Sequence, residues 1–480
     1  MLYAYIFVSE IYSTIILIFS LLFFTFLSQR KKFLKDLNKF SWFIILILSI
    51  FYFLSLLTSN TNIFYLSCGI YSNSVLYALR LVLSFIFIFY ILYLKTELKN
   101  FVFYSYEFFI ILFFSFLSLN MLLLSSNFIN IFIFLEFFSI CTFYLLSAQK
   151  TYEKSLEASI KYFIFSSLAS AIFLFGMFLI YYSTGINDLF ELLLLSTNNL
   201  FLTNNTIYIV GAILICFGLI FKIGAGIFFF WIVDVYEGIN YPMLIFLNIF
   251  VKVVYLFLLF FFLNSLNIFL LKIFIEILVF FTAFFSLIGA IYQVKVKKFL
   301  IFTSIYNITF FSINFWNFNE VFTSIFIFFC IFYLLNSLIL LIIFTSIKDW
   351  NSNMVIKNIM DLTNLLSQNK ILAYILSISL FTNAGLPPAT LFFAKFFILF
   401  EVYQTFNFLW FSLLFFFSIV SFFYYIRLIR IIFFSTPIIT IFLKPIPTTV
   451  CYILSFFTLF NLLFVFFFDK ILFIIDFFFY

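Results

Sequence analysis

The sequence predicts an all-α polytopic membrane protein with about 14 transmembrane helices. Of its 480 residues, 66% are hydrophobic and only 9% are charged. Apolar runs of about 20 residues, the length that crosses a hydrocarbon core of about 30 Å, recur along the whole chain. A β-barrel is excluded, because its strands would show short alternating segments in place of continuous apolar runs.

The expected spans are separated by short polar loops, and none of the loops has the length of a soluble domain. In order, the spans cover residues 3–28, 40–59, 75–94, 104–124, 127–148, 158–183, 206–234, 241–263, 268–290, 299–315, 319–346, 370–400, 407–435 and 450–468.

The positions of Lys and Arg predict how the chain crosses the membrane. Cytoplasmic or matrix loops collect these residues. Eighteen of the 25 lie in alternate loops, beginning with five in loop 29–39, and the loops between are poor in charge or acidic. Only Arg80 and Lys470 lie toward the opposite side. Both termini are therefore expected to face away from the matrix, and the net charge of +7 reflects loop asymmetry, with no nucleic-acid partner indicated.

Two spans are too long and too interrupted to be simple helices. The run from Asn205 to Asp234 has 30 residues, about 45 Å as one helix, and Gly224 and Gly226 favour a break within it. The twelfth span is broken by the segment Gly-Leu-Pro-Pro at 385–388, where proline removes a backbone donor. These two spans run in opposite directions five helices apart, which is typical of the inverted repeats of transporters and ion pumps.

The repeat hypothesis divides the chain into four parts. These are an N-terminal three-helix segment at 1–103, a first inverted repeat at 104–265 (helices 4–8), a second at 266–435 (helices 9–13), and a C-terminal helix at 436–480.

Five ionisable residues fall inside apolar spans and are the candidate functional residues. Glu136 is central in the fifth span, Lys222 precedes the first break, Lys252 is central in the eighth span, and Lys395 follows the second break. Lys161 is nearer the matrix end of the sixth span. A charged lysine at mid-bilayer costs roughly 2.5–3.5 kcal/mol, so such residues indicate a site that moves protons. The alternative is a set of structural pairs that only cancel this cost.

A fifth intramembrane lysine, Lys272, has Glu276 one turn later on the same helical face. It lies near the start of its span, where a lysine reaches the headgroups. We expect a snorkelling pair without a functional role.

Redox and metal sites are not indicated on this chain. There is no His, and the five Cys, at positions 68, 141, 216, 330 and 451, are scattered singly without ligand spacing. Haem, iron-sulfur and zinc sites all need clustered ligands. We therefore expect no cofactor and no electron transfer here.

Four segments carry a resemblance to a known family. They are SLEASIKYFIFSSLASAIFLFGMFLIYYSTG at 155–185, FK…W…DVYEG at 221–238, KKFLIFTSIYNITF at 297–310, and FTNAGLPPATLFFAKF at 381–396. With them the chain resembles subunit 2 of the mitochondrial NADH:ubiquinone oxidoreductase, complex I, and its bacterial equivalent among the antiporter-like subunits. The likeness covers most of the chain and is weak before residue 104.

The resemblance implies roles for the five intramembrane residues. Glu136 corresponds to the fifth-helix glutamate, Lys161 to its sixth-helix neighbour, Lys222 to the seventh-helix lysine, Lys252 to the central lysine and Lys395 to the distal one. In the family these form a hydrated axis driven by quinone reduction elsewhere in the complex. The resemblance also implies the mitochondrial inner membrane, contacts with membrane-arm subunits and lipids, and FMN, iron-sulfur clusters and ubiquinone on partner subunits only.

The chain departs from the family pattern at four positions. The family's seventh-helix Pro and His are Ile227 and Phe229, its DVYEG-preceding proline is Val233, and Thr390 replaces the usual glycine after the second break. Without the His, water is left to bridge Lys222 and Lys252.

Two other functions fit the same fold. One is a stand-alone cation/proton antiporter, which would not accompany NADH:quinone activity. The other is a scaffold subunit of complex I that moves no protons, which the loss of the His favours.

Overall fold

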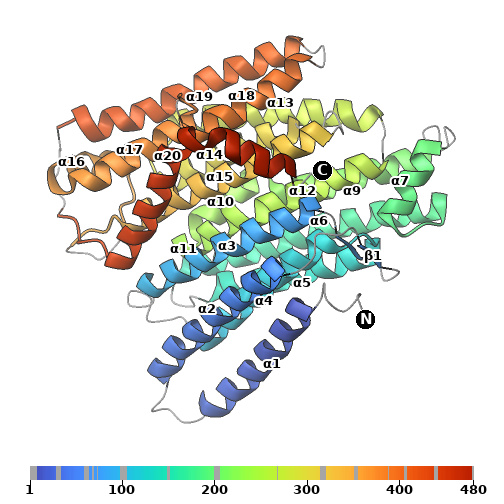
Figure 1. Ribbon diagram of the computed structural model, residues 1–480, viewed down its shortest axis with the longest axis horizontal. Coiled ribbons are helices and arrows are strands. Elements are labelled where there is room, and N and C mark those ends of the chain that lie inside the picture. The colour runs from blue at the N-terminus through green and yellow to red at the C-terminus, as the bar shows by residue number, and fades with distance from the viewer. Residues whose placement is uncertain are drawn as a thin grey trace. The chain divides into compact units, whose positions relative to one another are not determined.

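The structure is a computed structural model that describes residues 8–28, 34–58, 64–66, 70–72, 74–97, 105–148, 152–198, 206–266, 269–313, 320–350, 355–387, 389–436 and 442–477 (Figure 1). The main helices are α1 (Val8–Ser28), α2 (Leu34–Thr58), α3 (Ser74–Glu97), α4 (Tyr106–Leu124), α5 (Phe128–Ser147), α6 (Glu153–Thr184), α9 (Thr206–Ile223), α10 (Phe229–Gly238), α11 (Tyr241–Phe246), α12 (Lys252–Leu266), α13 (Phe269–Tyr292), α14 (Val296–Ile313), α15 (Glu320–Ser346), α17 (Lys370–Ala384), α18 (Thr390–Gln404), α19 (Phe408–Phe434) and α20 (Thr448–Phe477).

The predicted fold class is confirmed. Each expected span coincides with one helix or with a pair that continues across a break. Among the described residues, ten helices are long and apolar enough to cross a membrane, and three shorter apolar helices accompany them. The chain is therefore a multi-pass helical membrane protein.

Some short elements lie where the sequence indicated only loops. Strands β1 (Phe64–Leu66) and β2 (Ile70–Ser72) pair antiparallel, and helix α7 (Leu189–Asn198) follows α6. A 3₁₀ helix (Ile359–Asn364) and α16 (Leu365–Gln368) precede α17. These segments are too short or too polar to give the long apolar signal of a span.

The described chain forms two compact units. The first comprises Met1–Ile223, Gly238–Met243 and Phe250–Leu271, and the second comprises Gly224–Glu237, Leu244–Ile249 and Lys272–Tyr480. The four-part division into repeats and flanking segments stays a prediction.

In the first unit, α6 and α9 pack closely along a face of small residues. A Cβ added at Gly176 would lie 2.8 Å from the Gly211 carbonyl oxygen, and one at Gly218 would lie 2.9 Å from the Ala169 carbonyl oxygen. Small residues of this kind let helix backbones approach each other in a membrane. The two helices therefore hold each other through direct backbone contact.

This contact predicts the effect of a larger residue. Gly176→Val is expected to destabilise the protein by about 1–3 kcal/mol, because the α6 and α9 backbones must separate. The measurement is the thermal unfolding midpoint of the purified complex. Gly185→Asn is the matched control, because no atom lies within 4 Å of a Cβ there and Asn tolerates the left-handed conformation of Gly185. Equal midpoints for the two variants would contradict the prediction.

The three N-terminal helices hold a buried ion pair. The guanidinium of Arg80 on α3 pairs with the Glu10 carboxylate on α1 and donates a hydrogen bond of 2.9 Å to the Tyr52 hydroxyl on α2. Arg80 is 3% exposed, although its place near the start of a span suggested a residue near the membrane surface. The Arg80–Glu10 pair neutralises two charges that would be costly between apolar helices. Together with the bond to Tyr52, it links α1, α2 and α3.

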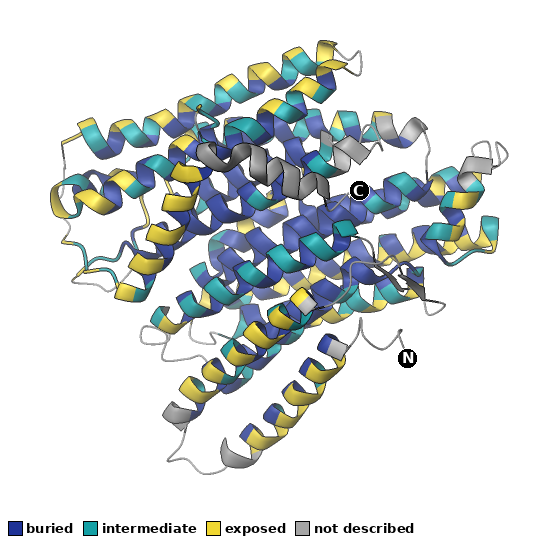
Figure 2. Cartoon of the chain, viewed as in Figure 1, coloured by how far each residue is buried: buried dark blue, intermediate teal, exposed yellow. Residues whose placement is uncertain are grey.

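In the second unit, α15 is the central helix and packs against α14, α17, α18 and α20. Figure 2 shows α15 almost entirely dark blue, whereas α19 carries many exposed residues. An apolar helix that is buried all round is typical of the interior of a bundle.

Two of the motif segments meet in the second unit. Glu237, in the DVYEG turn at the end of α10, pairs with Lys295 Nζ at 2.5 Å and with Lys298 Nζ at 2.9 Å. Lys298 is the second residue of the segment KKFLIFTSIYNITF at 297–310, so this ion-pair cluster joins two of the four segments that carry the family resemblance. It ties the end of α10 to the start of α14.

Candidate functional site

The first break lies directly after Lys222. Helix α9 ends at Ile223, Gly224 and Gly226 have φ values of 70° and 65°, and a 3₁₀ turn (Gly226–Phe228) leads into α10. These left-handed values are readily adopted only by glycine, so the break expected from the two glycines is confirmed. Lys222 is 8% exposed, and its Nζ makes no hydrogen bond within the described residues.

Glu136 is half-buried on α5 and acts on Lys222 through its charge. The two side chains interact electrostatically but form no direct ion pair. Ser139 Oγ lies 3.3 Å from Glu136 Oε2, and Glu136 Oε1 has no hydrogen-bond partner in the described part of the chain. One carboxylate oxygen of Glu136 is therefore available to accept a proton.

Two buried hydroxyl residues near Glu136 were not singled out from the sequence. Thr142, on α5, donates a hydrogen bond of 3.0 Å to the hydroxyl of Tyr162 on α6. Tyr162 also interacts electrostatically with Glu136. An isolated Thr in an apolar helix gives no distinct sequence signal, because it also bonds within its own helix, and Tyr162 is one of 29 Tyr residues in the chain.

Lys161 lies on the outward side of α6. Its Nζ pairs with Glu157 at 2.5 Å, one turn earlier, and its side chain is 43% exposed. The structure therefore places Lys161 in an exposed ion pair within its own helix.

Lys252 follows a local irregularity in its helix. A π-helical segment (Leu247–Val251) joins α11 to α12, and Lys252, 2% exposed, is the first residue of α12. Helix α12 packs against α9, and the rings of Tyr255 and Phe138 on α5 are 6.0 Å apart. The helices that carry Glu136, Lys222 and Lys252 thus pack within one unit. Single π turns in helices frequently mark functional sites.

At the second break, Lys395 is hydrogen-bonded to the backbone at the end of α17. Helix α17 ends at Ala384, and its C-cap residue Gly385 has a φ of 82°. Lys395 Nζ donates a hydrogen bond of 2.8 Å to the carbonyl oxygen of Asn383, one of the carbonyls left free where α17 ends. The ammonium also lies 5.8 Å and 5.3 Å from the ring centres of Tyr306 and Phe310, within cation–π range.

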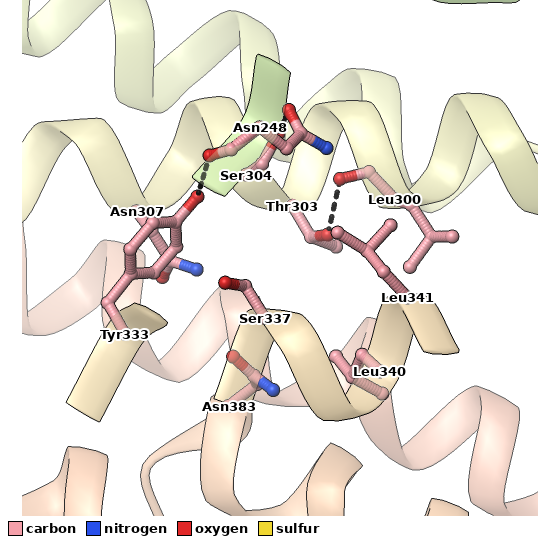
Figure 3. A pocket seen from close by; sticks show the side chains of 10 residues that line it. All are labelled: Asn248, Leu300, Thr303, Ser304, Asn307, Tyr333, Ser337, Leu340, Leu341 and Asn383. Atoms are coloured by element: carbon pink, nitrogen blue, oxygen red, sulfur yellow. Dashed lines mark hydrogen bonds between the residues drawn. The ribbon is translucent and has the colours of Figure 1, made fainter. Parts of the chain in front are cut away.

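A polar cavity lies beside Asn383 in the second unit (Figure 3). The volume that the centre of a water molecule can occupy in this cavity is about 20 Å³, which is enough for at least one water. Tyr333 donates to the Asn248 carbonyl oxygen at 3.5 Å and Ser304 to Asn248 Oδ1 at 3.2 Å, while Asn307 Oδ1 has no hydrogen-bond partner among the described residues. The polar lining residues are Asn248, Thr303, Ser304, Asn307, Tyr333, Ser337 and Asn383.

The residue at the place of the family's His is packed among aromatic rings. Phe229 lies with its ring centre 5.4 Å from that of Phe285 and 6.0 Å from that of Phe302. The surroundings are apolar, and position 229 cannot carry a proton because the phenylalanine side chain has no titratable group.

Two remaining expectations concern sites without a functional role. The side chain of Lys272 lies outside the described residues, so its pairing with Glu276 stays a prediction; Glu276 accepts a hydrogen bond of 3.1 Å from Trp410 Nε1. Within the described residues, no three His, Cys, Asp or Glu side chains gather as metal ligands.

Buried cations beside two broken helices, on a multi-pass helical fold, define a protein of the ion-translocating class. The chain belongs to the NADH:quinone oxidoreductase/Mrp antiporter transmembrane family, whose model matches residues 125–423. The resemblance drawn from the motifs is thereby confirmed. Helices α1 to α4 and α20 lie outside the matched region.

Individual relatives agree with this family. The chain is 30% identical over 368 residues to NADH-ubiquinone oxidoreductase chain 2 of Marchantia polymorpha, covering 74% of this chain and 71% of the relative. It is 32% identical over 336 residues to NADH-quinone oxidoreductase subunit N of a Wolbachia from Brugia malayi, covering 68% and 70%.

Solved structures share the fold at lower identity. A chain of respiratory complex I from Thermus thermophilus matches with a TM-score of 0.76 and 20% identity, over 91% of this chain and 93% of that chain. A chain of the Mrp complex from Dietzia sp. DQ12-45-1b matches with a TM-score of 0.78 and 13% identity, over 98% and 95%.

Proposed function

We propose that this chain is the antiporter-like membrane subunit of respiratory complex I that corresponds to chain 2 or subunit N of its relatives. It translocates protons through Glu136, Lys222, Lys252 and Lys395, with Lys161 toward the matrix end. It lies in the mitochondrial inner membrane with both termini on the intermembrane-space side. The observation that carries this proposal is Lys395, whose buried ammonium is bonded to the carbonyl end of a broken helix next to a polar cavity.

The proton step follows from the surroundings of the lysines. An ammonium in a low-dielectric site releases its proton more readily than one in water, and a nearby carboxylate opposes that release. Movement of charge toward or away from Glu136 would therefore switch Lys222 between holding and releasing its proton. The cavity waters beside Asn383 would accept and return the proton of Lys395, since water can bridge polar groups in such a site.

The energy for this transport comes from partner subunits. Moving one proton against the membrane potential costs about 2.3 kcal/mol per 100 mV. The sequence carries no nucleotide-binding or redox motif, so the chain depends on NADH:ubiquinone oxidoreduction in subunits that bind FMN, iron-sulfur clusters and ubiquinone. Its partners are the other membrane-arm subunits and the surrounding lipids.

Glu136→Gln tests the proposal. We expect proton transfer through this subunit to slow about tenfold, because one nearby charge commonly changes a proton equilibrium by about one pKa unit. The measurement is the number of protons pumped per NADH oxidised by the complex in proteoliposomes. Glu153→Gln, an identical change at an exposed residue in the first turn of α6, is the control. Equal proton yields from the two variants would support the scaffold function in place of the pump.

The stand-alone antiporter makes a different prediction from the same preparation. Native gel electrophoresis would separate this chain from NADH:quinone activity if it worked alone. Co-migration of the chain with that activity is expected, because no energy source for pumping is present on the chain itself.

A further inference from the structure

Three uncharged polar residues meet in the second unit at the start of α18. Asn461 Nδ2 donates to Asn336 Oδ1 at 2.6 Å, Asn336 Nδ2 donates to Thr390 Oγ1 at 3.2 Å, and Thr390 Oγ1 donates to Asn461 Oδ1 at 3.5 Å. Each side chain donates once and accepts once, so the three bonds close into a ring. We call this set, Asn336, Thr390 and Asn461, the polar ring.

The ring joins three helices at a buried point. Asn336 belongs to α15, Thr390 is the first residue of α18, and Asn461 belongs to α20, and these helices pack against one another (Figure 1). The exposures of the three side chains are 0%, 0% and 3%. In a membrane no water is available to replace these bonds, so the helices stay together at this point while the ring is intact.

The position of Thr390 connects the ring with Lys395. Thr390 begins the half-helix that follows the second break, and Lys395 lies five residues later, about 7.5 Å along the axis. At the other side of the break, a Cβ on Gly385 would lie 3.2 Å from Lys395 Cδ. The Lys395 side chain therefore returns to the break that the ring anchors.

We infer that Asn461 is a positioning residue for Lys395: through the polar ring, α20 fixes the start of α18 and so keeps the Lys395 ammonium at the Asn383 carbonyl. This inference rests on the proposed role of Lys395 in proton transfer. It assigns a task to α20, which lies beyond the family match that ends at residue 423. The ring also depends on Thr390, where glycine, the residue usual in the family, would offer no hydroxyl.

Asn461→Leu is the first test, made on the whole complex. It removes two of the three ring bonds, and we expect the amides of residues 389–396 to exchange hydrogen about three- to tenfold faster, because interhelical hydrogen bonds in membranes contribute at this scale. We also expect fewer protons pumped per NADH. Thr458→Val is the matched control, since Thr458 lies one turn away on α20 and bonds only to the Ser455 carbonyl of its own helix.

A second pair of variants keeps the test valid if Asn461→Leu does not assemble. Thr390→Val removes the hydroxyl at nearly constant volume, whereas Thr390→Ser retains it. We expect the valine variant to show faster exchange and lower proton yield, and the serine variant to restore both. Because the ring acts as one unit, Thr390→Val combined with Asn461→Leu should be no worse than the more damaging single variant.

The outcomes separate this inference from the proposed function. Unchanged exchange at 389–396 in Asn461→Leu and Thr390→Val would overturn the ring as an anchor. Faster exchange with an unchanged proton yield would overturn the positioning of Lys395, and the proposed function would then be decided by substitution of Lys395 itself. Equal losses in Thr390→Val and Thr390→Ser would also overturn the inference, because the hydroxyl would then have no part in the effect.

Discussion

Replacing Lys395 by leucine is expected to stop proton transfer through this chain while the complex still assembles. The lysine is buried at the second break, with its proton-bearing Nζ on the Asn383 carbonyl oxygen and next to the polar cavity. Loss of a positioned proton-transfer group commonly lowers a rate by about 10²–10⁴-fold. Removing a charge from the interior of a membrane protein also removes the cost of inserting that charge, so assembly should be retained.

Lys395→Arg separates proton exchange from simple charge. Arginine keeps the cation and the hydrogen-bond donors, but it does not release its proton in proteins. We therefore expect Lys395→Arg to lose proton transfer as completely as Lys395→Leu, measured as protons pumped per NADH in proteoliposomes. Lys357→Leu, on an exposed loop of the same unit, controls for the loss of a positive charge. An active arginine variant would show that Lys395 acts as a fixed cation and not as a proton carrier.

The amino-acid sequence is sufficient to predict the membrane-spanning helices and both breaks, but not the short helices α7 and α16. Long apolar runs are dictated by the membrane thickness, and glycine and proline mark the places where a helix inside the membrane ends. Lys222 and Lys395 can also be identified from the sequence, because a charged residue within a long apolar run stands out. The residues that these lysines contact cannot be identified in this way, since contacts between helices distant in the chain leave no periodic signal.

The polar groups around the site show this limit most clearly. Asn336 and Asn461 are 125 residues apart in the chain yet bonded to each other, and neither differs by type from the many other Asn residues of the sequence. Thr390 was noticed only as a departure from the family pattern, and the structure gives its hydroxyl two partners. Phe229, in contrast, stands where the family has a His, so the sequence alone indicates that a proton-carrying residue is missing there. Its ring packs against those of Phe285 and Phe302, which is an apolar environment.

Substitution of Gly224 by valine is expected to give the largest loss of stability of any single change considered. Gly224 has φ 70°, and a Cβ at this position would lie 2.6 Å from Cγ1 of Ile232, which is 1% exposed. The left-handed conformation costs an L-residue about 1–2 kcal/mol, and overpacking a buried site adds about 1–3 kcal/mol. Because Lys222 stands two residues before this glycine, the distortion would also reach the proposed proton path.

The measurement is the amount of assembled complex on a native gel, together with its thermal unfolding midpoint. Ala225→Ser is the matched control, because Ala225 lies in the same break with an ordinary φ of −88°. Gly224→Ala is expected to fall between the two, since it carries the backbone strain and one added carbon but not the branched side chain. If Gly224→Ala assembled as well as Ala225→Ser, the break would not require a left-handed residue, and its position after Lys222 would have to be set by packing alone.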